Sequence, residues 1–424
     1  MLLSLYVSNF LSFKEKMEFS FVSSDNRNND TFFSIKKEYQ KKMKTYTINK
    51  VNAIFWANAS GKTNVLKSIN FIKEMVLYSH NQNFSPSRFG YKPYALSTEK
   101  GESEFWVDFF VDDVLYSYSF IIDFFSDRIL KEMLLEYKSQ KATTLFRRNK
   151  QNFFISETFP EWKERKNFVR SNSLALSVFS NMSWEKSSKI WRFFKEKIHV
   201  FFVNRNNSFS QGQFDMSDTI SMIDRYPKDF PNFLNDLLVS ADTNINRMNY
   251  KFEERFINDD AKLDIPNNNW KLRLFFNYFT HSIYDKKWTE VWEINFSPND
   301  ESTWTNRLVS LSWSLYNVIK NWMTLFVDEL DGSLHPLLVR EIVSMFNWKN
   351  NKKGWQLVFT SHDVTLLNDR NILPKDQVRF VDKNKKWESS IYSLDDFNWV
   401  NSIANIEKAY LLWKFDAIPH INQF

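Results

Sequence analysis

The chain has 424 residues, of which 43% are hydrophobic and 25% are charged, a composition typical of a folded globular protein. It contains no cysteine and no run of 18 apolar residues, which excludes disulfides, cysteine–zinc sites and a membrane-spanning helix. The net charge of +6 is compatible with a nucleic-acid partner but does not by itself indicate one. The first residues show no basic leader and no cleavage site, and with the missing cysteines they predict a cytoplasmic protein.

The first hundred residues are predicted to form strands followed by a strand–loop–helix unit. Alternating apolar residues predict strands between Met1 and Phe21, and a connection rich in Lys and Asn follows over Asp25–Lys44. The apolar run Val51–Phe55 predicts a short strand. From Lys62 to Leu77, apolar residues recur three and four positions apart, which predicts a helix.

The middle of the chain separates this part from a second α/β stretch. Strand patterns over Glu104–Ile155 predict an antiparallel sheet, whereas residues 160–260 are predicted to be largely helical, with one apolar run before Asn204. After Trp270 the predicted elements are helices over Arg307–Lys320 and Leu337–Phe346 and strands over Thr324–Val327, Gln356–Thr360 and Val378–Val381. The pattern predicts an α/β fold with a long insertion, in three parts: residues 1–100, 101–270 and 271–424.

The strongest motif lies between the predicted strand and helix of the first part. It has the spacing of a phosphate-binding loop, made of Trp56, Ala57, Asn58, Ala59, Ser60, Gly61, Lys62 and Thr63, with Asn64 next to it. Gly61 lets backbone amides approach phosphate oxygens, and the helix start adds a partial positive charge. Lys62 is expected to contact the β- and γ-phosphates, and the Thr63 hydroxyl to bind Mg²⁺. The alternative is a turn that carries these residues by chance.

Two later strands end in side chains that suit nucleotide chemistry. Asp328 and Glu329 follow an apolar strand and suit an Mg²⁺ ligand and a catalytic carboxylate that orients the attacking water. Their alternative role is to cap a helix. A further strand leads to His362, at the carboxyl end where α/β folds bind their ligands. The functional interpretation of His362 is a γ-phosphate contact, and the alternative is a structural histidine.

These motifs, in this order, resemble those of AAA15-type ATP-binding proteins, which are relatives of the RecF, Rad50/SMC and OLD-type ATPases. The resemblance runs nearly end to end, through LLSLYVSNFLSFKEKMEFS, NAIFWANASGKTNVLKSI, ESTWT (Glu301–Thr305), VDELDGSLHP (Val327–Pro336), FTSHD and EKAYLLWKFDAIP (Glu407–Pro419). It implies an α/β P-loop NTPase head of the ABC/SMC type. Such a head would carry an antiparallel β lobe and a largely helical insertion between the Walker A and Walker B motifs.

The resemblance also implies a homodimer that holds ATP and Mg²⁺ between two copies of the chain. One copy would supply Lys62, Thr63, Asp328, Glu329 and His362. The other would supply the signature segment, for which Glu301–Thr305 is the candidate, with Ser302 opposite the γ-phosphate and Trp304 beside it. A local alternative is a helix cap made by Thr303 or Thr305. The segment Ser333–Pro336 matches the one that faces the partner copy.

Glycine and tryptophan occur in abnormal numbers. A chain of this length has on average roughly 30 glycines, yet this one has 6, together with 16 tryptophans. The family has glycine where this chain has Trp56, Trp304, Trp322, Trp387 and Trp413, and Trp313 and Trp399 are further candidates. At Trp56, a bulky residue forced to a positive φ would cost about 1–2 kcal/mol. We therefore hypothesise that UGA codons that mean glycine in the cell are written here as tryptophan; the alternative is a degenerate ATPase.

The sequence as a whole predicts an ATPase that hydrolyses ATP to ADP and phosphate and thereby opens and closes a dimer. The resemblance implies a role in nucleic-acid maintenance or phage defence, with DNA or RNA and a separately encoded nuclease as partners and no membrane. Basic clusters such as Arg147, Arg148 and Lys150 either contact phosphates or are ordinary surface. A non-catalytic ATP-binding scaffold is the alternative. A GTPase is disfavoured because no Asn-Lys-x-Asp motif, which recognises guanine, follows the phosphate loop. A small-molecule kinase is disfavoured because the two-part ATPase core leaves no evident lid for an acceptor substrate.

Overall fold

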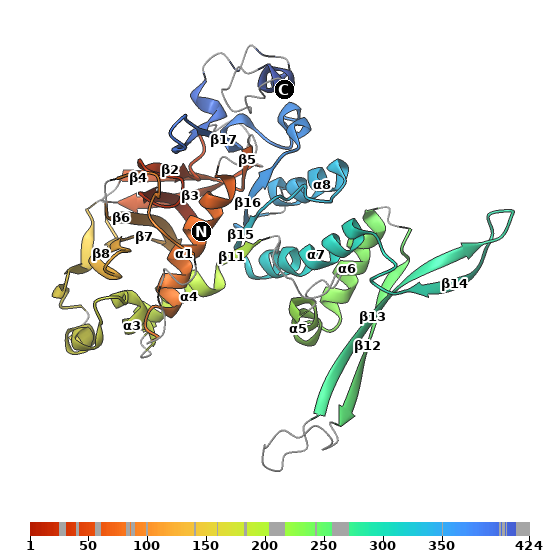
Figure 1. Ribbon diagram of the computed structural model, residues 1–424, viewed down its shortest axis with the longest axis horizontal. Helices are drawn as coiled ribbons and strands as arrows, with labels where there is room; N and C mark the ends of the chain where they lie inside the picture. Colours follow the sequence, from red (N-terminus) through yellow and green to blue (C-terminus); the bar gives the residue numbers. More distant parts are fainter. Residues whose placement is uncertain are drawn as a thin grey trace. The chain divides into compact units, whose positions relative to one another are not determined.

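The computed structural model describes residues 1–24, 31–39, 42–55, 61–81, 85, 90–98, 101–139, 141–158, 160–181, 185–202, 217–241, 244–256, 271–349, 351–397, 400, 403 and 405–412. The chain divides into two compact units, whose elements are shown in Figure 1. Unit 1 consists of Met1–Val203, Asn321–Gly332 and Val339–Phe424, and unit 2 of Asn204–Lys320 and Ser333–Leu338. Unit 1 therefore joins segments that are far apart in the sequence.

A six-stranded sheet forms one layer of unit 1, with the strand order β11-β15-β16-β5-β17-β18. Its strands are β5 (Val51–Phe55), β11 (Ile198–Phe201), β15 (Thr324–Val327), β16 (Gln356–Ser361), β17 (Val378–Lys383) and β18 (Ser389–Ser393). All neighbours run parallel except β17 and β18. Every residue of β5, β15 and β16 is buried, as expected for parallel strands that are covered on both faces.

A second sheet of unit 1 is antiparallel and has seven strands in the order β10-β9-β8-β7-β6-β1-β2. They are β1 (Leu2–Ser8), β2 (Met17–Ser20), β6 (Ser103–Val111), β7 (Val114–Asp123), β8 (Arg128–Tyr137), β9 (Thr143–Asn149) and β10 (Asn152–Ile155). Along β6 and β7, more and less buried residues alternate, so one face of the sheet meets the core and the other is more open. This sheet is the antiparallel lobe that the sequence predicts.

Helices α1 (Lys62–Tyr78), α3 (Ala175–Asn181) and α4 (Glu185–Glu196) pack against one another in unit 1. Phe71 of α1 reaches the buried face of the antiparallel sheet, where its ring lies 4.8 Å from that of Phe105. The same hydrophobic cluster includes Ile54 of β5 and Phe326 of β15. One core therefore connects the helix that follows the phosphate loop with the six-stranded and the seven-stranded sheets of unit 1.

The segment predicted as a connection over Asp25–Lys44 contains regular structure instead. Strands β3 (Phe32–Tyr39) and β4 (Lys42–Asn49) pair as an antiparallel hairpin, so that prediction is wrong for the paired residues. Lys36 and Lys44 lie at exposed positions of this hairpin, and lysines at such positions obscure its apolar alternation in the sequence. The remaining helices are α2 (Pro160–Arg165), α8 (Pro336–Asn347) and α9 (Ile406–Leu411), with 3₁₀ turns at Lys166–Phe168, Val364–Asn368, Lys375–Gln377 and Leu394–Asp396.

Unit 2 combines helices with a three-stranded antiparallel sheet. Its elements are α5 (Ser217–Arg225), α6 (Asp229–Ser240), β12 (Arg247–Phe256), β13 (Lys271–Tyr284), β14 (Glu290–Phe296) and α7 (Thr303–Asn321), of which the last residue belongs to unit 1. Tyr316 of α7 packs its ring against Phe230 and Phe233 of α6. The prediction of helix up to residue 260 is wrong for β12, where Met248, Tyr250 and Phe252 alternate as in a strand.

The expected α/β fold with an antiparallel lobe is confirmed, and the insertion contains strands as well as helices. In the part of the chain that the structure describes, we find no helix long and apolar enough to cross a membrane.

Candidate functional site

Three predicted motifs lie at the carboxyl ends of neighbouring parallel strands. β5 leads into the phosphate loop, β15 into Asp328 and β16 into His362. Because β16 pairs with both β15 and β5, these carboxyl ends meet at one edge of the sheet. Five predicted loop residues lie outside the described residues: Trp56, Ala57, Asn58, Ala59 and Ser60.

Thr63 and Asp328 are in direct contact at this edge. The Thr63 hydroxyl donates to the Asp328 carboxylate, with its Oγ1 2.9 Å from Oδ2 and 3.2 Å from Oδ1. A hydroxyl and a carboxylate side by side are hard oxygen ligands, and Mg²⁺ in nucleotide sites commonly takes one or two carboxylates together with phosphates and water. The two side chains therefore fit the Mg²⁺ role that the sequence predicts for them.

Lys62 and His362 also meet, although 300 positions separate them. The Nζ atom of Lys62 lies 3.1 Å from Nδ1 and 2.5 Å from Nε2 of the imidazole. Lys62 is buried, with 7% of its surface exposed, at the start of α1. An ammonium and an imidazole that converge at a helix N-terminus form a site with donors for anionic oxygens.

Glu329 has an unusual backbone conformation that Thr360 supports. Its φ is +50°, in the left-handed region that non-glycine residues seldom adopt. Its N–H donates to the Thr360 hydroxyl over 2.7 Å, and the same hydroxyl donates to Asp328 Oδ1 over 2.9 Å. Thr360 thus links both carboxylate residues, a role that sequence reasoning missed. The signal was its place two residues before His362, on the strand next to β15.

Asp331 supports the histidine from the other side. Its Oδ2 accepts a hydrogen bond from the backbone N–H of His362 over 2.9 Å. Its Oδ1 is buried and has no hydrogen-bond partner within the described ranges. Asp331 therefore ties the end of β16 to the segment that follows β15.

Gly61 occupies a narrow space with a positive φ of +113°. A Cβ atom there would lie 2.5 Å from Ser12 Oγ and 2.9 Å from Ser389 Oγ. Asn64, one turn along α1, donates from Nδ2 to the same Ser12 hydroxyl over 2.8 Å. The requirement for glycine at the end of the predicted loop is therefore both conformational and steric.

The proposed signature residues lie in unit 2, at the start of α7. Ser302 precedes the helix, and its hydroxyl accepts from the Thr305 N–H over 3.1 Å, as an N-cap does. Trp304 is partly buried in the first turn. Glu301, from the same segment, contacts His281 Nε2 through Oε1 over 2.6 Å. Ser302, and neither of the two threonines considered, thus caps the helix.

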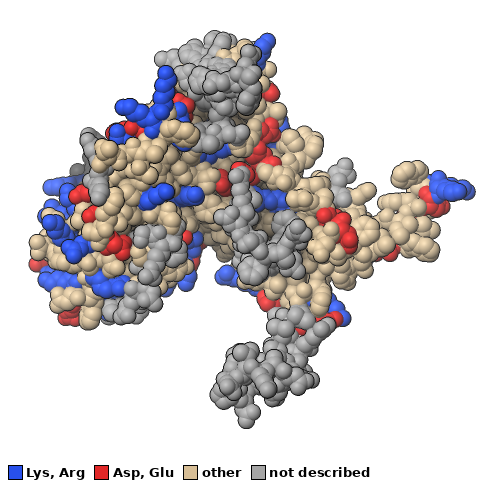
Figure 2. Space-filling model, in the orientation of Figure 1, with Lys and Arg blue, Asp and Glu red and all other residues tan. Residues whose placement is uncertain are grey.

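The basic residues at positions 147, 148 and 150 differ in exposure: Arg147 and Lys150 are exposed, whereas Arg148 is buried. Arg148 is 1% exposed, and its Nη1 lies 3.6 Å from Oε2 of the buried Glu132, so the expectation of a phosphate contact or solvated surface is wrong for this residue. Burial raises the pKa of Glu132, and the charge of Arg148 opposes that rise. On the face shown in Figure 2, basic and acidic side chains are interspersed.

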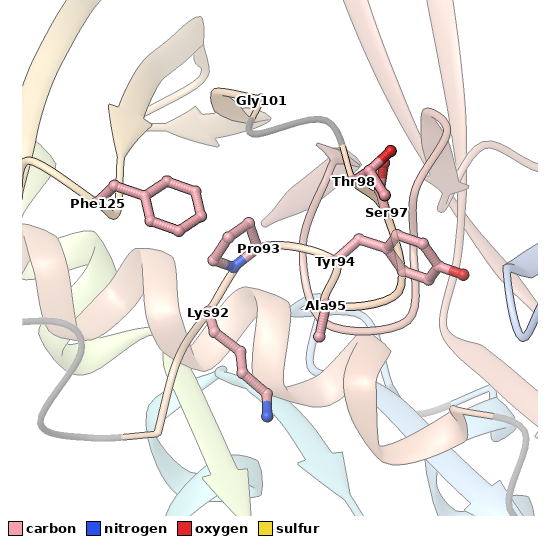
Figure 3. A pocket seen from close by; sticks show the side chains of 8 residues that line it. All are labelled: Lys92, Pro93, Tyr94, Ala95, Ser97, Thr98, Gly101 and Phe125. Atoms are coloured by element: carbon pink, nitrogen blue, oxygen red, sulfur yellow. The ribbon is translucent and has the colours of Figure 1, made fainter.

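A separate pocket lies beside the segment 90–98, shown in Figure 3. It is lined by Lys92, Pro93, Tyr94, Ala95, Ser97, Thr98, Gly101 and Phe125, and the ring of Phe125 points toward Pro93. It shares no lining residue with the edge where Lys62 and Asp328 lie. The pocket is therefore distinct from the candidate nucleotide site.

A family model matches residues 51–368, more than half of the chain, and its description is "AAA domain, putative AbiEii toxin, Type IV TA system". No curated protein matches in sequence. Among solved structures, the chain is similar to an SMC head bound to the C-terminal winged-helix domain of ScpA (11% identity, TM-score 0.44, 92% of this chain and 97% of that one). It is also similar to the SMC head domain from Thermotoga maritima (15% identity, TM-score 0.39, 92% of this chain and 98% of that one). Because the family model covers more than half of its residues, the chain belongs to this AAA-domain family of P-loop ATPases.

Proposed function

We propose that the protein hydrolyses ATP and that this cycle opens and closes a homodimer. The observation that carries the proposal is the meeting of two pairs at one sheet edge: Lys62 with His362, and Thr63 with Asp328. A phosphate loop, a metal-binding carboxylate and a polar residue near the γ-phosphate are the parts that phosphoryl transfer to water requires. Membership of a P-loop ATPase family supports the same assignment.

Each residue has a defined part in this chemistry. Lys62 binds the β- and γ-phosphate oxygens, and His362 donates to the γ-phosphate. Thr63 and Asp328 hold Mg²⁺, which when bound offsets the negative charge of the phosphates. Glu329 orients the attacking water and accepts its proton. Asn64, whose side chain donates to Ser12, would contribute to the nucleotide site from the third residue of α1.

The dimer part of the proposal concerns the start of α7. We propose that Ser302 of a second copy approaches the γ-phosphate, with Trp304 beside it. The support is the resemblance of Glu301–Thr305 to a signature segment and its position at the N-terminus of a long helix, whose N–H groups favour anions.

Substitution of Glu329→Gln tests the proposal, with Glu341→Gln, a change at an exposed position of α8, as the matched control. Hydrolysis should fall by about 10²–10⁴-fold, while ATP binding persists and a nucleotide-bound dimer accumulates on a sizing column. The control should behave as the parent protein. Unchanged turnover in Glu329→Gln would rule out this catalytic role. A parent protein that binds ATP but does not hydrolyse it would be the alternative scaffold.

The cellular role is the broadest part of the proposal. The family description names a toxin of a type IV toxin–antitoxin system, and we propose a cytoplasmic role in phage defence or nucleic-acid maintenance, with DNA or RNA and a separate nuclease as partners. Cells that carry the gene should survive phage challenge better than cells that carry Lys62→Ala. Equal survival of the two would contradict a nucleotide-dependent defence role.

A further inference from the structure

Three tryptophans have backbone conformations that glycine favours. The φ angles of Trp288, Trp322 and Trp387 are +60°, +54° and +67°. In this region the Cβ of an L-residue crowds the following carbonyl, and bulky side chains are genuine outliers there. Each of the three stands at a position of a recurrent turn or cap.

Trp288 is the last of three residues that Asp285 and Thr289 enclose in the hairpin between β13 and β14. Its N–H donates to the Asp285 carbonyl over 3.0 Å, and the Asp285 N–H donates to the Thr289 carbonyl over 2.9 Å. The Asp285 carboxylate also accepts from the N–H groups of Lys287 and Thr289. This is a type I turn followed by a left-handed bulge residue, the position where such hairpins place glycine.

Trp387 repeats this geometry in unit 1, in the hairpin between β17 and β18. Its N–H donates to the Asn384 carbonyl over 2.9 Å, and the Asn384 N–H donates to the Glu388 carbonyl over 3.1 Å. The Asn384 side chain accepts from the N–H groups of Lys386 and Glu388, as Asp285 does in the other hairpin. Two unrelated hairpins therefore have tryptophan at the same glycine position.

Trp322 is the first residue after α7. A left-handed residue at this place closes a large share of helices, and it is usually glycine because no Cβ then has to be accommodated. The chain continues from Trp322 through Met323 into β15, so this turn precedes the strand that leads into Asp328.

The contacts of the three indole rings offset little of the free-energy cost of the left-handed backbone. Trp288, Trp322 and Trp387 are 83%, 45% and 57% exposed, although tryptophan is on average a highly buried residue. Lys353 Nζ lies 4.1 Å from the ring centre of Trp322, and Lys383 Nζ lies 4.1 Å from that of Trp387. An exposed cation–π contact is worth about 2- to 5-fold in the folding equilibrium constant. The left-handed backbone costs about 5- to 30-fold, so the cost dominates.

We propose that positions 288, 322 and 387 are glycine in the protein that its own cell makes, because UGA is decoded there as glycine. The low glycine count and the high tryptophan count then have one cause. Since a codon has one meaning within one cell, every tryptophan written with UGA is glycine as well, and for Trp56 this would restore the first glycine of the phosphate loop. Trp56, Trp399 and Trp413 lie outside the described residues, and Trp304 and Trp313 lie in α7 without a positive φ.

The direct test is the mass of three tryptic peptides from the native protein, isolated from its own cells. The peptides are residues 288–307, 321–340 and 387–408, and each begins after a lysine. Fragment masses that place glycine at positions 288, 322 and 387 support the proposal, and UGA at the three codons agrees with them. Tryptophan at any one of the three positions overturns it.

Variants of the tryptophan-containing protein test the physical argument separately. Trp288→Gly, Trp322→Gly and Trp387→Gly should each raise the folding equilibrium constant by about 5- to 30-fold in urea unfolding. The alanine variants are the matched controls, because alanine removes the indole but keeps the Cβ. They should gain much less. Equal gains for alanine and glycine would show that loss of the ring is responsible and would overturn the backbone argument.

A buried tryptophan provides the opposite control. Trp162 is 1% exposed, and its ring stacks on that of Phe179 at 5.0 Å between centroids. Trp162→Gly should therefore lower the folding equilibrium constant by more than 100-fold, as expected for the loss of a large core side chain (~3–5 kcal/mol, converted). A gain at Trp162 similar to that at the three turn positions would mean that stability does not distinguish glycine positions, and would count against the proposal.

Discussion

The Thr360 hydroxyl donates a hydrogen bond to the Asp328 carboxylate, and it does so from the strand that neighbours β15. The same hydroxyl accepts a hydrogen bond from the backbone N–H of Glu329, so one side chain orients both acidic residues. Thr360→Val keeps the shape and removes these bonds. Under the proposed function we expect hydrolysis to fall by about 10- to 100-fold, the range of a lost hydrogen bond to a charged group.

The effect of Thr360→Val should act through the metal. We expect the Mg²⁺ concentration for half-maximal hydrolysis to rise while ATP affinity changes little, because Lys62 is untouched. Thr360→Ser keeps the hydroxyl and should retain most of the activity. If the valine and serine variants have the same Mg²⁺ dependence, Thr360 has only a packing role.

Gly61→Ala should abolish nucleotide binding and destabilise unit 1. The added Cβ would lie 2.5 Å from Ser12 Oγ, and the φ of +113° disfavours any side chain. Gly90→Ala is a suitable control, since Gly90 also has a positive φ (+76°) but nothing lies within 4 Å of its Cβ position. Nucleotide titration should show loss of binding for the first variant only. A Gly61→Ala protein that binds ATP normally would contradict the steric argument.

Breaking the buried pair of Arg148 and Glu132 should destabilise the antiparallel lobe. Arg148 donates to the carbonyl groups of Ser173 and Arg170 at 2.6 and 2.9 Å, and Glu132 accepts from Tyr118 and from the start of α3. Arg148→Met leaves a buried carboxylate without its cation, which costs about 3–5 kcal/mol. Urea unfolding measures this loss.

Arg147→Met supplies the comparison for the Arg148 variant. Arg147 is the preceding residue of β9 but is exposed. Its replacement should change the free energy of unfolding by less than about 0.5 kcal/mol. Similar losses for the two variants would show that burial of Arg148 is not the source of its effect.

His199 should make the protein sensitive to acid. Burial, assisted by the charge of Lys73, lowers the pKa of this imidazole to about 3, from 6.5 in the unfolded chain. Between these values the unfolded state binds a proton that the folded state does not. Stability therefore falls as the pH falls from about 6.5 to 3, by up to about 1.4 kcal/mol per pH unit.

Urea unfolding at several pH values tests the assignment to His199. His199→Gln should flatten the decline in stability below pH 6.5, because glutamine takes up no proton in this range. His335→Gln, a change at an exposed position, should leave the slope as it is in the parent protein. A slope that His199→Gln does not alter would assign the acid sensitivity to other groups.

The strands of the nucleotide site could be predicted because their physical demands are local. Val51–Phe55 and Thr324–Val327 were predicted from apolar runs bounded by polar motifs, and the structure has β5 and β15 at these residues. Strands that are covered on both faces need a continuous apolar run, so their bounds are visible in the sequence. The helix predicted from Lys62 to Leu77 extends by one residue, as α1.

The missed features depend on neighbours that are remote in the chain. Thr360 matters because β15 and β16 pair in a particular parallel register, which a single sequence does not specify. Arg148 looked like part of a basic cluster, and only its contact with Glu132 shows that it points into the core. Trp288 was not among the predicted glycine positions, since its turn is recognisable only from the backbone bonds of Asp285.

The strand order of the six-stranded sheet has a consequence for synthesis. Among the strands that the structure describes, β5 pairs with β16 and β17 alone, and β16 begins at residue 356. At ~5–20 residues per second, the ribosome needs roughly 15–60 s to make the intervening 300 residues. Throughout that interval the apolar strand VNAIF has neither hydrogen-bonding neighbour, which is the state in which strand edges aggregate. A fragment that ends before β16 therefore keeps the phosphate loop but lacks the sheet that presents it.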